Sequence, residues 1–198
     1  AFVTAEALSN TMRFVYLHTG GERLPLRRAD EPHGAGAAVI WDKDTVYFVT
    51  DEGDDIHYLA RYDVPTRTVA QLVRLEGQDM IHLEAHREGN ALYILAMQGV
   101  ADRLYRYDLD TGRLDEIPLP YDTVEGLHVA KSGTLYVLGR SSDVPFNISR
   151  LVPGGDWERL TDNRVLGVAP ESLRPAEVVR YKSFDGLDGP LPVLDGID

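Results

Sequence analysis

The tetrapeptide Leu92-Tyr93-Ile94-Leu95 has two counterparts in the chain, Val46-Tyr47-Phe48-Val49 and Leu135-Tyr136-Val137-Leu138. Each is a short apolar run around a tyrosine, and the three tyrosines follow one another at intervals of 46 and 43 residues. Short runs of apolar, β-branched and aromatic residues predict β-strands. The interval indicates a repeated unit of about 40 to 50 residues, which is typical of propeller blades.

A second strand and a hairpin turn repeat with the same period. Leu59-Ala60-Arg61-Tyr62-Asp63-Val64 matches Leu104-Tyr105-Arg106-Tyr107-Asp108-Leu109 at an interval of 45 residues. Turn residues recur at Thr19-Gly20, Pro65-Thr66, Asp110-Thr111-Gly112 and Gly154-Gly155. Glycine and short polar residues supply the tight geometry of hairpins. Four such turns predict four units.

The first unit is incomplete in the sequence. Residues 14–24 have the pattern of the last two strands of a blade, with another strand expected around Phe2 to Leu8. No window shows sustained helical spacing of apolar residues. We therefore predict an all-β fold, a β-propeller of four-stranded antiparallel blades with about four blades, and hence small, open or partial. Residues 1–170 would form the blades and residues 171–198 a linker tail.

The composition narrows the classes of partner. A formal net charge of −12 and a pI near 4.9 disfavour nucleic acid and anionic membrane surfaces as partners. The chain has no cysteine, which permits a reducing compartment and makes the cytoplasm the expected location. No apolar run is long enough to span a bilayer, and the first residues lack the features of a signal peptide.

The end of the chain carries its most specific motif. Leu160-Thr161 is followed by Pro175-Ala176-Glu177 and then by Arg180-Tyr181-Lys182-Ser183-Phe184-Asp185-Gly186. This order resembles the junction between propeller and α/β-hydrolase domain in the prolyl-oligopeptidase family of serine peptidases. Residues 139–148 are similar to a blade loop of the acylaminoacyl-peptidase-like branch of that family.

The resemblance implies a propeller that caps a peptidase active site and filters or orients peptide substrates. The expected partners are therefore peptides, a hydrolase domain or a partner protein, and open blade edges would also allow a homodimer. The family's nucleophile lies in a Gly-x-Ser-x-Gly motif, which this chain lacks. Gly139-Arg140-Ser141-Ser142-Asp143 matches only half of it, so no catalytic residue is carried over. The tail also departs, because Pro190 and Pro192 argue against a continuing central strand.

One cluster of polar residues stands out as a candidate site. In Ile81-His82-Leu83-Glu84-Ala85-His86, the two-residue period of a strand puts His82, Glu84 and His86 on one face and the apolar residues on the other. Aligning Gly89 with Gly133 places His128 of the next unit at the position of Glu84. We predict that these four residues line a central channel. Such a set suits Zn²⁺, but water-facing polar residues are common there, and neither a metal nor a cofactor is predicted.

Two further functions remain open on the sequence. A propeller of the TolB or WD-repeat type would act as a protein-interaction module, although the repeat signatures of the latter are missing. A metal-dependent lactonase-type propeller would need ligands at the channel, for which only the histidine cluster offers support. The acidic turn Asp51-Glu52-Gly53-Asp54-Asp55 lacks the spacing of a calcium loop and is expected to be a solvated turn. Trp41 and Trp157 are expected to pack between blades.

Overall fold

The computed structural model describes residues 1–9, 12–27, 34–169, 172–184, 186 and 188–193. Within these ranges the chain is built from β-strands, and none of its described segments forms a helix with the length and apolar character needed to cross a membrane. The predicted all-β class is confirmed.

The strands form five antiparallel sheets that follow the order of the chain. A three-stranded sheet comes first, three four-stranded sheets follow, and a two-stranded hairpin ends the described chain. The strands are β1 (Phe2–Ala7), β2 (Arg13–Thr19), β3 (Glu22–Pro25), β4 (Ala35–Ile40), β5 (Thr45–Thr50), β6 (Tyr58–Asp63), β7 (Thr68–Val73), β8 (Asp79–His86), β9 (Ala91–Gln98), β10 (Ala101–Asp108), β11 (Leu114–Ile117), β12 (Thr123–Val129), β13 (Leu135–Arg140), β14 (Asn147–Leu151), β15 (Trp157–Arg159), β16 (Glu177–Lys182) and β17 (Asp188–Val193).

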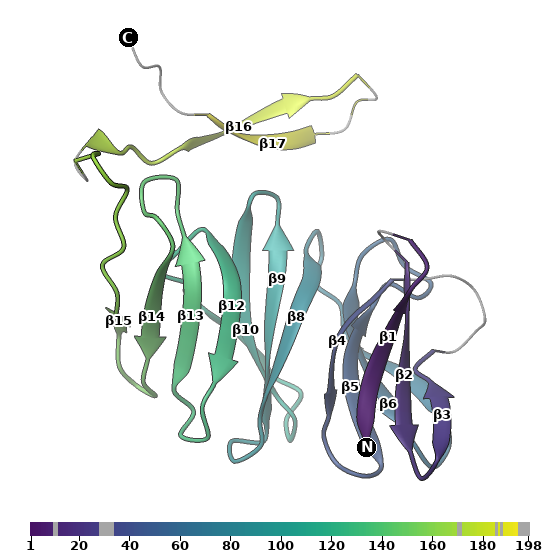
Figure 1. Cartoon of the computed structure of the whole chain (residues 1–198). Coiled ribbons are helices and arrows are strands. Elements are labelled where there is room, and N and C mark those ends of the chain that lie inside the picture. Colours follow the sequence, from purple (N-terminus) through teal and green to yellow (C-terminus); the bar gives the residue numbers. More distant parts are fainter. Residues whose placement is uncertain (10–11, 28–33, 170–171, 185, 187, 194–198) are drawn as a thin grey trace.

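The first four sheets are the predicted blades and stand side by side in an open arc (Figure 1). We call β1–β3, β4–β7, β8–β11 and β12–β15 the first to fourth blades. The strand β4 packs against β8, and β8 against β12, so the first strand of each complete blade lies on the inner side of the arc. The last strand of each blade lies outside and leads to the next inner strand. Four blades, the first of them three-stranded, make a small and open propeller.

The hydrophobic core is divided into three clusters, one at each contact between neighbouring blades. Val15 and Leu17 of the first blade pack with Phe48 and Tyr62 of the second. The opposite face of the second blade meets the third, and the opposite face of the third meets the fourth. Each blade thus buries both faces only where it has a neighbour on each side, as expected of stacked repeats. Trp41 and Trp157 pack against the second and third clusters, which confirms their predicted role.

The hairpins between strands repeat one hydrogen-bonded turn. The carboxylate of Asp63 accepts bonds from the backbone N–H and the hydroxyl of Thr66, at 2.9 and 2.6 Å. Asp108 accepts the same pair from Thr111, at 3.0 and 2.8 Å. Gly112 then takes a φ of 70°, which a residue with a side chain rarely adopts. The shared Asp-x-x-Thr pattern is therefore a turn that closes the outer hairpin of two blades.

The tail forms a separate hairpin of β16 and β17, which crosses the ends of the blades in Figure 1. Pro190 and Pro192 lie in a strand, Asp188–Val193, but this strand belongs to a two-stranded sheet. It is therefore not a central strand, in agreement with the expectation. Proline is tolerated at such edges because its missing N–H removes no interior ladder bond. We call the end of the blades beneath this hairpin, where the β9–β10 and β13–β14 loops lie, the hairpin end.

One detail of the predicted strand pattern is wrong. Ile81 was expected to share the buried face of Leu83, but it is 41% exposed. A β-bulge between Met80 and His82 shifts the register, and Met80 takes the buried position beside Leu83 instead. An extra residue in one strand turns the following side chains to the other face, which a strict alternation cannot anticipate.

Candidate functional site

Three of the four candidate residues lie together on β8. His82, Glu84 and His86 stand opposite Leu95, Tyr93 and Ala91 of β9 and share one face of the strand. Tyr93 and Leu95 belong to the cluster between the third and fourth blades. The three side chains therefore point toward the fourth blade.

Their contacts differ along the strand. Nε2 of His82 lies 3.5 Å from Oε1 of Glu84, is shielded from solvent and has no hydrogen-bond partner in the described part of the chain. Nε2 of His86 lies 3.0 Å from the carbonyl oxygen of Lys131 in the fourth blade. The ring of His86 is also packed so closely against Gly89 and Gly133 that a Cβ at either glycine would press on it. His86 thus joins two blades, whereas His82 keeps a buried nitrogen unused.

His128 is not brought to the other three residues. His128 of β12 pairs with Tyr136 of β13, just as Glu84 of β8 pairs with Tyr93 of β9. The predicted alignment of His128 with Glu84 therefore agrees with the strand pairing. Equivalent positions in successive blades point the same way around the arc. The fourth blade therefore separates His128 from Glu84, and the His128 side chain is exposed on the far face. Among the residues that the structure describes, no three His, Asp or Glu side chains are grouped as metal ligands.

A crevice of about 400 Å³ opens beside His82 between the third and fourth blades. Its walls are Ile81, His82, Leu95, Asp102, Thr123, Val124, Glu125, Gly126, Leu127 and Arg140. A second hollow of about 410 Å³ shares Thr123 and Arg140 with it and extends to Ser141 and Ser142 and to Ala176 and Val178 of the tail. We call these two hollows together the inter-blade crevice. It lies at the hairpin end.

The tail is fixed over this crevice by a polar contact. The backbone N–H of Ala176 donates to Oγ of Ser142 at 2.7 Å. Earlier in the linker, Thr161 and Asn163 also bind the fourth blade. The buried side chain of Asn147 accepts bonds from the hydroxyl of Thr161 and the N–H of Asn163, at 2.9 and 2.7 Å. These contacts hold the segment that carries the junction motif against the fourth blade.

Arg140 supplies the positive charge of the crevice. Its guanidinium lies 4.9 Å from the centre of the Phe146 ring, a cation–π contact. It forms no ion pair with a carboxylate in the described part of the chain, although Asp122 and Glu125 also line the crevice. A guanidinium with no carboxylate partner in the described chain, beside hydroxyls and apolar walls, can donate hydrogen bonds to an acceptor group of a ligand.

Asp102 forms the polar floor of the crevice. The residue is 9% exposed, and its carboxylate accepts the backbone N–H of Val124 in the next blade at 2.7 Å. Burial raises the pKa of this carboxyl group above its usual value, because the charged form loses its hydration, and the bond from Val124 only partly offsets the effect. The bond from Val124 to Asp102 therefore links the two blades. The free-energy cost of burying Asp102 is greater when its carboxyl group is charged.

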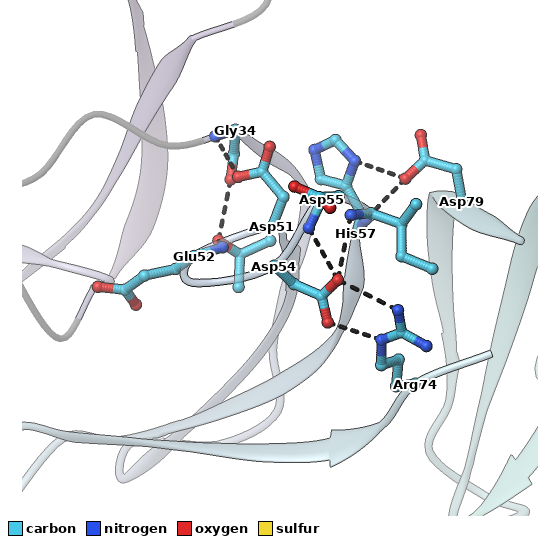
Figure 2. Close-up of polar contacts among 10 residues, drawn as sticks. Gly34, Asp51, Glu52, Asp54, Asp55, His57, Arg74 and Asp79 are labelled. Atoms are coloured by element: carbon cyan, nitrogen blue, oxygen red, sulfur yellow. Dashed lines mark hydrogen bonds and ion pairs between the residues drawn. The ribbon is translucent and has the colours of Figure 1, made fainter. Parts of the chain in front are cut away.

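A corresponding contact joins the second blade to the third. Both the backbone N–H and Nδ1 of His57 contact Oδ1 of Asp79, at 2.6 and 2.8 Å (Figure 2). His57 precedes Asp63 by six residues, as Asp102 precedes Asp108, so the two residues hold equivalent positions. The sequence around His57 shows no motif that predicts a partner for it. The matching positions of His57 and Asp102 in their repeats are the signal that indicates a partner for His57 in the next blade.

The acidic turn is occupied by internal contacts. Asp54 binds the guanidinium of Arg74 at 2.6 Å, and its other oxygen accepts the N–H of Asp55 at 2.8 Å (Figure 2). The Arg74 bond holds the pKa of Asp54 below its usual range. Asp51 accepts the N–H of Gly34. The expected turn is present, but Asp51 and Asp54 bind within the protein, so these two carboxylates are not simply solvated as expected.

Solved structures of peptidases share this fold. A puromycin-hydrolyzing peptidase from Mycobacterium tuberculosis is 17% identical and superposes with a TM-score of 0.71 over 89% of this chain and 28% of its own. A puromycin hydrolase mutant in complex with PGG is 16% identical, with a TM-score of 0.71 over 94% of this chain and 32% of its own. Prolyl oligopeptidase B from Galerina marginata, bound to a 35mer substrate, is 12% identical, with a TM-score of 0.72 over 91% and 27%.

These likenesses cover the propeller portion of the peptidases, and this chain spans less than a third of their length. At such identities the likeness is one of fold, and the resemblance predicted from the junction motif is confirmed at that level. No family model matches the sequence, and no curated protein matches it.

Proposed function

We propose that this chain is a non-catalytic propeller domain of a prolyl-oligopeptidase-like serine peptidase and that it admits and orients peptides at its hairpin end. The observation that carries the proposal is the position of the junction segment. The residues that resemble the link to a hydrolase domain lie over the inter-blade crevice, held by the bond from Ala176 to Ser142. A catalytic domain attached there would face the crevice, so the crevice would border the space that substrates enter.

The chemistry of the crevice supports peptides as the ligand. Arg140 offers a guanidinium without an ion-pair partner in the described chain, and Thr123, Ser141 and Ser142 offer hydroxyl groups. A positioned charge that binds one end of a peptide fixes its orientation, which assists catalysis without any bond chemistry in the propeller. The chain has no Gly-x-Ser-x-Gly motif, so the proposed role is selection of substrates.

Peptide binding to the purified chain tests the proposal. We expect labelled short peptides to bind more tightly than long ones, measured by fluorescence anisotropy, and Arg140→Ala to raise the Kd about tenfold through loss of a charge-assisted bond. Arg150→Ala is the matched control, because Arg150 lies in the same blade but pairs with Glu158. Equal effects of the two substitutions would contradict the proposed site. Turnover of a peptide substrate, blocked by a serine-directed fluorophosphonate, would contradict the non-catalytic role.

A further inference from the structure

The carboxyl group of Asp102 has one oxygen in use and one open to the inter-blade crevice. Oδ2 accepts the backbone N–H of Val124 at 2.7 Å. Oδ1 has no hydrogen-bond partner in the described part of the chain, and it is not shielded from solvent as Nε2 of His82 is. Because Asp102 lines the crevice and is only 9% exposed, its Oδ1 reaches solvent through the crevice.

His82 presents a second acceptor to the same crevice. Its Nε2 is shielded from solvent and lies 3.5 Å from Oε1 of Glu84, which favours the tautomer that carries the proton on Nε2. Nδ1 then carries the lone pair. Among the described residues Nδ1 has no partner, and it is not shielded as Nε2 is. The crevice wall therefore holds an open imidazole nitrogen.

Strand pairing puts these two acceptors on one wall of the crevice. His82 pairs with Leu95 of β9, and Leu95 pairs with Leu104 of β10. Asp102 lies two residues before Leu104 and therefore shares its face. Leu95 and Leu104 belong to the cluster between the third and fourth blades. The side chains of His82 and Asp102 thus both face the fourth blade.

Glu125 of the fourth blade adds a second negative charge to this side of the crevice. It is exposed, lines the crevice and forms no ion pair in the described chain. The charge of Glu125 contributes to the raised pKa of Asp102, after burial, so the two carboxyl groups lie near enough to interact. Arg140 pairs with neither of them. The two acids therefore lack a counter-ion from the described part of the protein.

We propose that this side of the crevice is an ammonium site, in which Asp102 and Glu125 are the counter-ions of a primary ammonium group and Nδ1 of His82 is a further acceptor. An ammonium group has three N–H donors and one positive charge, which match three acceptors and an excess of negative charge. An anion would be repelled by the two carboxylates. An apolar group would leave Oδ1 of Asp102 covered and without a partner.

The ammonium site rests on the proposed function for its ligand and specifies the group that is bound. In a peptide this group is either the N-terminus or the side chain of a lysine. Arg140 lies where the two hollows of the crevice meet, so a peptide held at Asp102 can extend toward a positive charge. Opposite charges at the two sides of the crevice favour one direction of the bound peptide over the reverse.

Three short peptides and one amine test the ammonium site on the whole chain. The Val124 N–H bonds the carboxylate of Asp102, so its NMR chemical shift reports binding at this group. Trialanine carries its ammonium at the N-terminus, and N-acetyl-lysyl-alanyl-alanine carries it only on the side chain, so the pair distinguishes the two sources. N-acetyl-trialanine lacks the group and should bind at least about tenfold more weakly than the better of these two. Butylammonium chloride presents the group without a peptide.

Substitutions that remove one negative charge locate the site. Asp102→Asn keeps an acceptor for Val124 and should raise the Kd of the better ammonium peptide about tenfold, with no effect on N-acetyl-trialanine. Glu125→Gln alters an exposed side chain and should raise it about threefold. Glu88→Gln is the matched control, because Glu88 is exposed in the β8–β9 loop, at the other end of the blade, and its loss should leave the Kd unchanged.

The outcomes separate the ammonium site from the proposed function. Equal binding of all three peptides, or a Kd that neither Asp102→Asn nor Glu125→Gln changes, would overturn the ammonium site. Peptide binding that depends on Arg140 but not on Asp102 would overturn it and leave the proposed function standing. Saturable binding of butylammonium that Asp102→Asn weakens, without binding of any peptide, would support the ammonium site and contradict the proposed function.

Discussion

Nδ1 of His57 lies 2.8 Å from Oδ1 of Asp79 and joins the loop of one blade to the inner strand of the next. The same carboxylate oxygen also receives the backbone N–H of His57. Asp102 makes the equivalent connection one blade later, by accepting the N–H of Val124. Both contacts lie at the hairpin end, so the geometry of the proposed peptide site depends on how each blade is fixed to its neighbour.

Replacing Asp79 with alanine should destabilise the protein. Two hydrogen bonds from His57 are lost at once, and we expect the free energy of unfolding to fall by about 1–2 kcal/mol. Urea titration followed by circular dichroism measures the change. Asp55→Ala is the control, because Asp55 is exposed and lies in the acidic turn just before His57, and its effect should stay within about 0.5 kcal/mol. Equal losses for both variants would mean that the contact between blades contributes nothing specific.

Asp102 should make stability depend on pH. Its pKa is raised in the folded state, so the folded protein binds this proton more tightly than the unfolded chain does. The stabilisation by the neutral carboxyl group is complete below the unfolded pKa and is lost as the pH rises through the folded pKa. Asp102→Asn keeps an acceptor for Val124 and carries no charge. The free energy of unfolding of this variant, relative to the original chain, should therefore increase from acidic to neutral pH.

A second substitution at Asp102 distinguishes charge from hydrogen bonding. Asp102→Ala leaves the buried N–H of Val124 without its acceptor, and we expect a loss of about 1–3 kcal/mol at neutral pH. If alanine and asparagine gave the same stability at every pH, the bond to Val124 would have no measurable role.

The hydrogen bonds that Asp108 accepts in its turn predict a lowered pKa, which NMR can measure. Bonds from the hydroxyl and N–H of Thr111 lower the pKa of Asp108, so its contribution to stability is present above the unfolded pKa and is lost as the pH falls through the folded pKa. Thr111→Val removes the hydroxyl and should move the pKa of Asp108 back toward its ordinary range. Thr111→Ser should retain the lowered pKa. A carboxyl titration that is unchanged by valine would contradict the assignment.

Gly133 and Gly154 form a matched pair for testing the packing of His86. Both have positive φ, 82° and 75°, so alanine at either position incurs a backbone cost of about 1–2 kcal/mol. At Gly154 a Cβ meets nothing within 4 Å, whereas at Gly133 it lies 3.0 Å from Cε1 of His86. Gly133→Ala should therefore destabilise more than Gly154→Ala, and it should shift the NMR signals of the His86 ring. Identical effects would show that the His86 ring moves freely.

The blades could be predicted from the sequence because their signals are local. The apolar run of Val46 to Val49 and the Asp-x-x-Thr turn each depend on neighbouring residues, and both recur in successive blades. The bulge at Ile81 could not be predicted, since it is set by pairing with β9. Local pattern gives the elements, and pairing decides which side chain reaches the core.

The candidate site was harder to predict for a geometric reason. His82, Glu84 and His86 share a face because they alternate on one strand, which the sequence shows directly. The position of His128 relative to them depends on how blades follow one another in space. Residues at equivalent positions of neighbouring blades point the same way around the arc. His128 and Glu84 are equivalent in this sense, so one blade lies between them. The crevice around Arg140 arises from two blades and the tail, and no single segment carries its pattern.

The division of the core into three clusters has a consequence for how the molecule loses its structure. Each cluster belongs to two adjacent blades, and none extends through the whole arc. Cooperativity in such an array passes only between nearest neighbours, so an end blade can open while the others remain folded. Among the described residues, the first and fourth blades each pack against a neighbouring blade on one side only. Unfolding should therefore begin at the two ends and reach last the contact between the second and third blades.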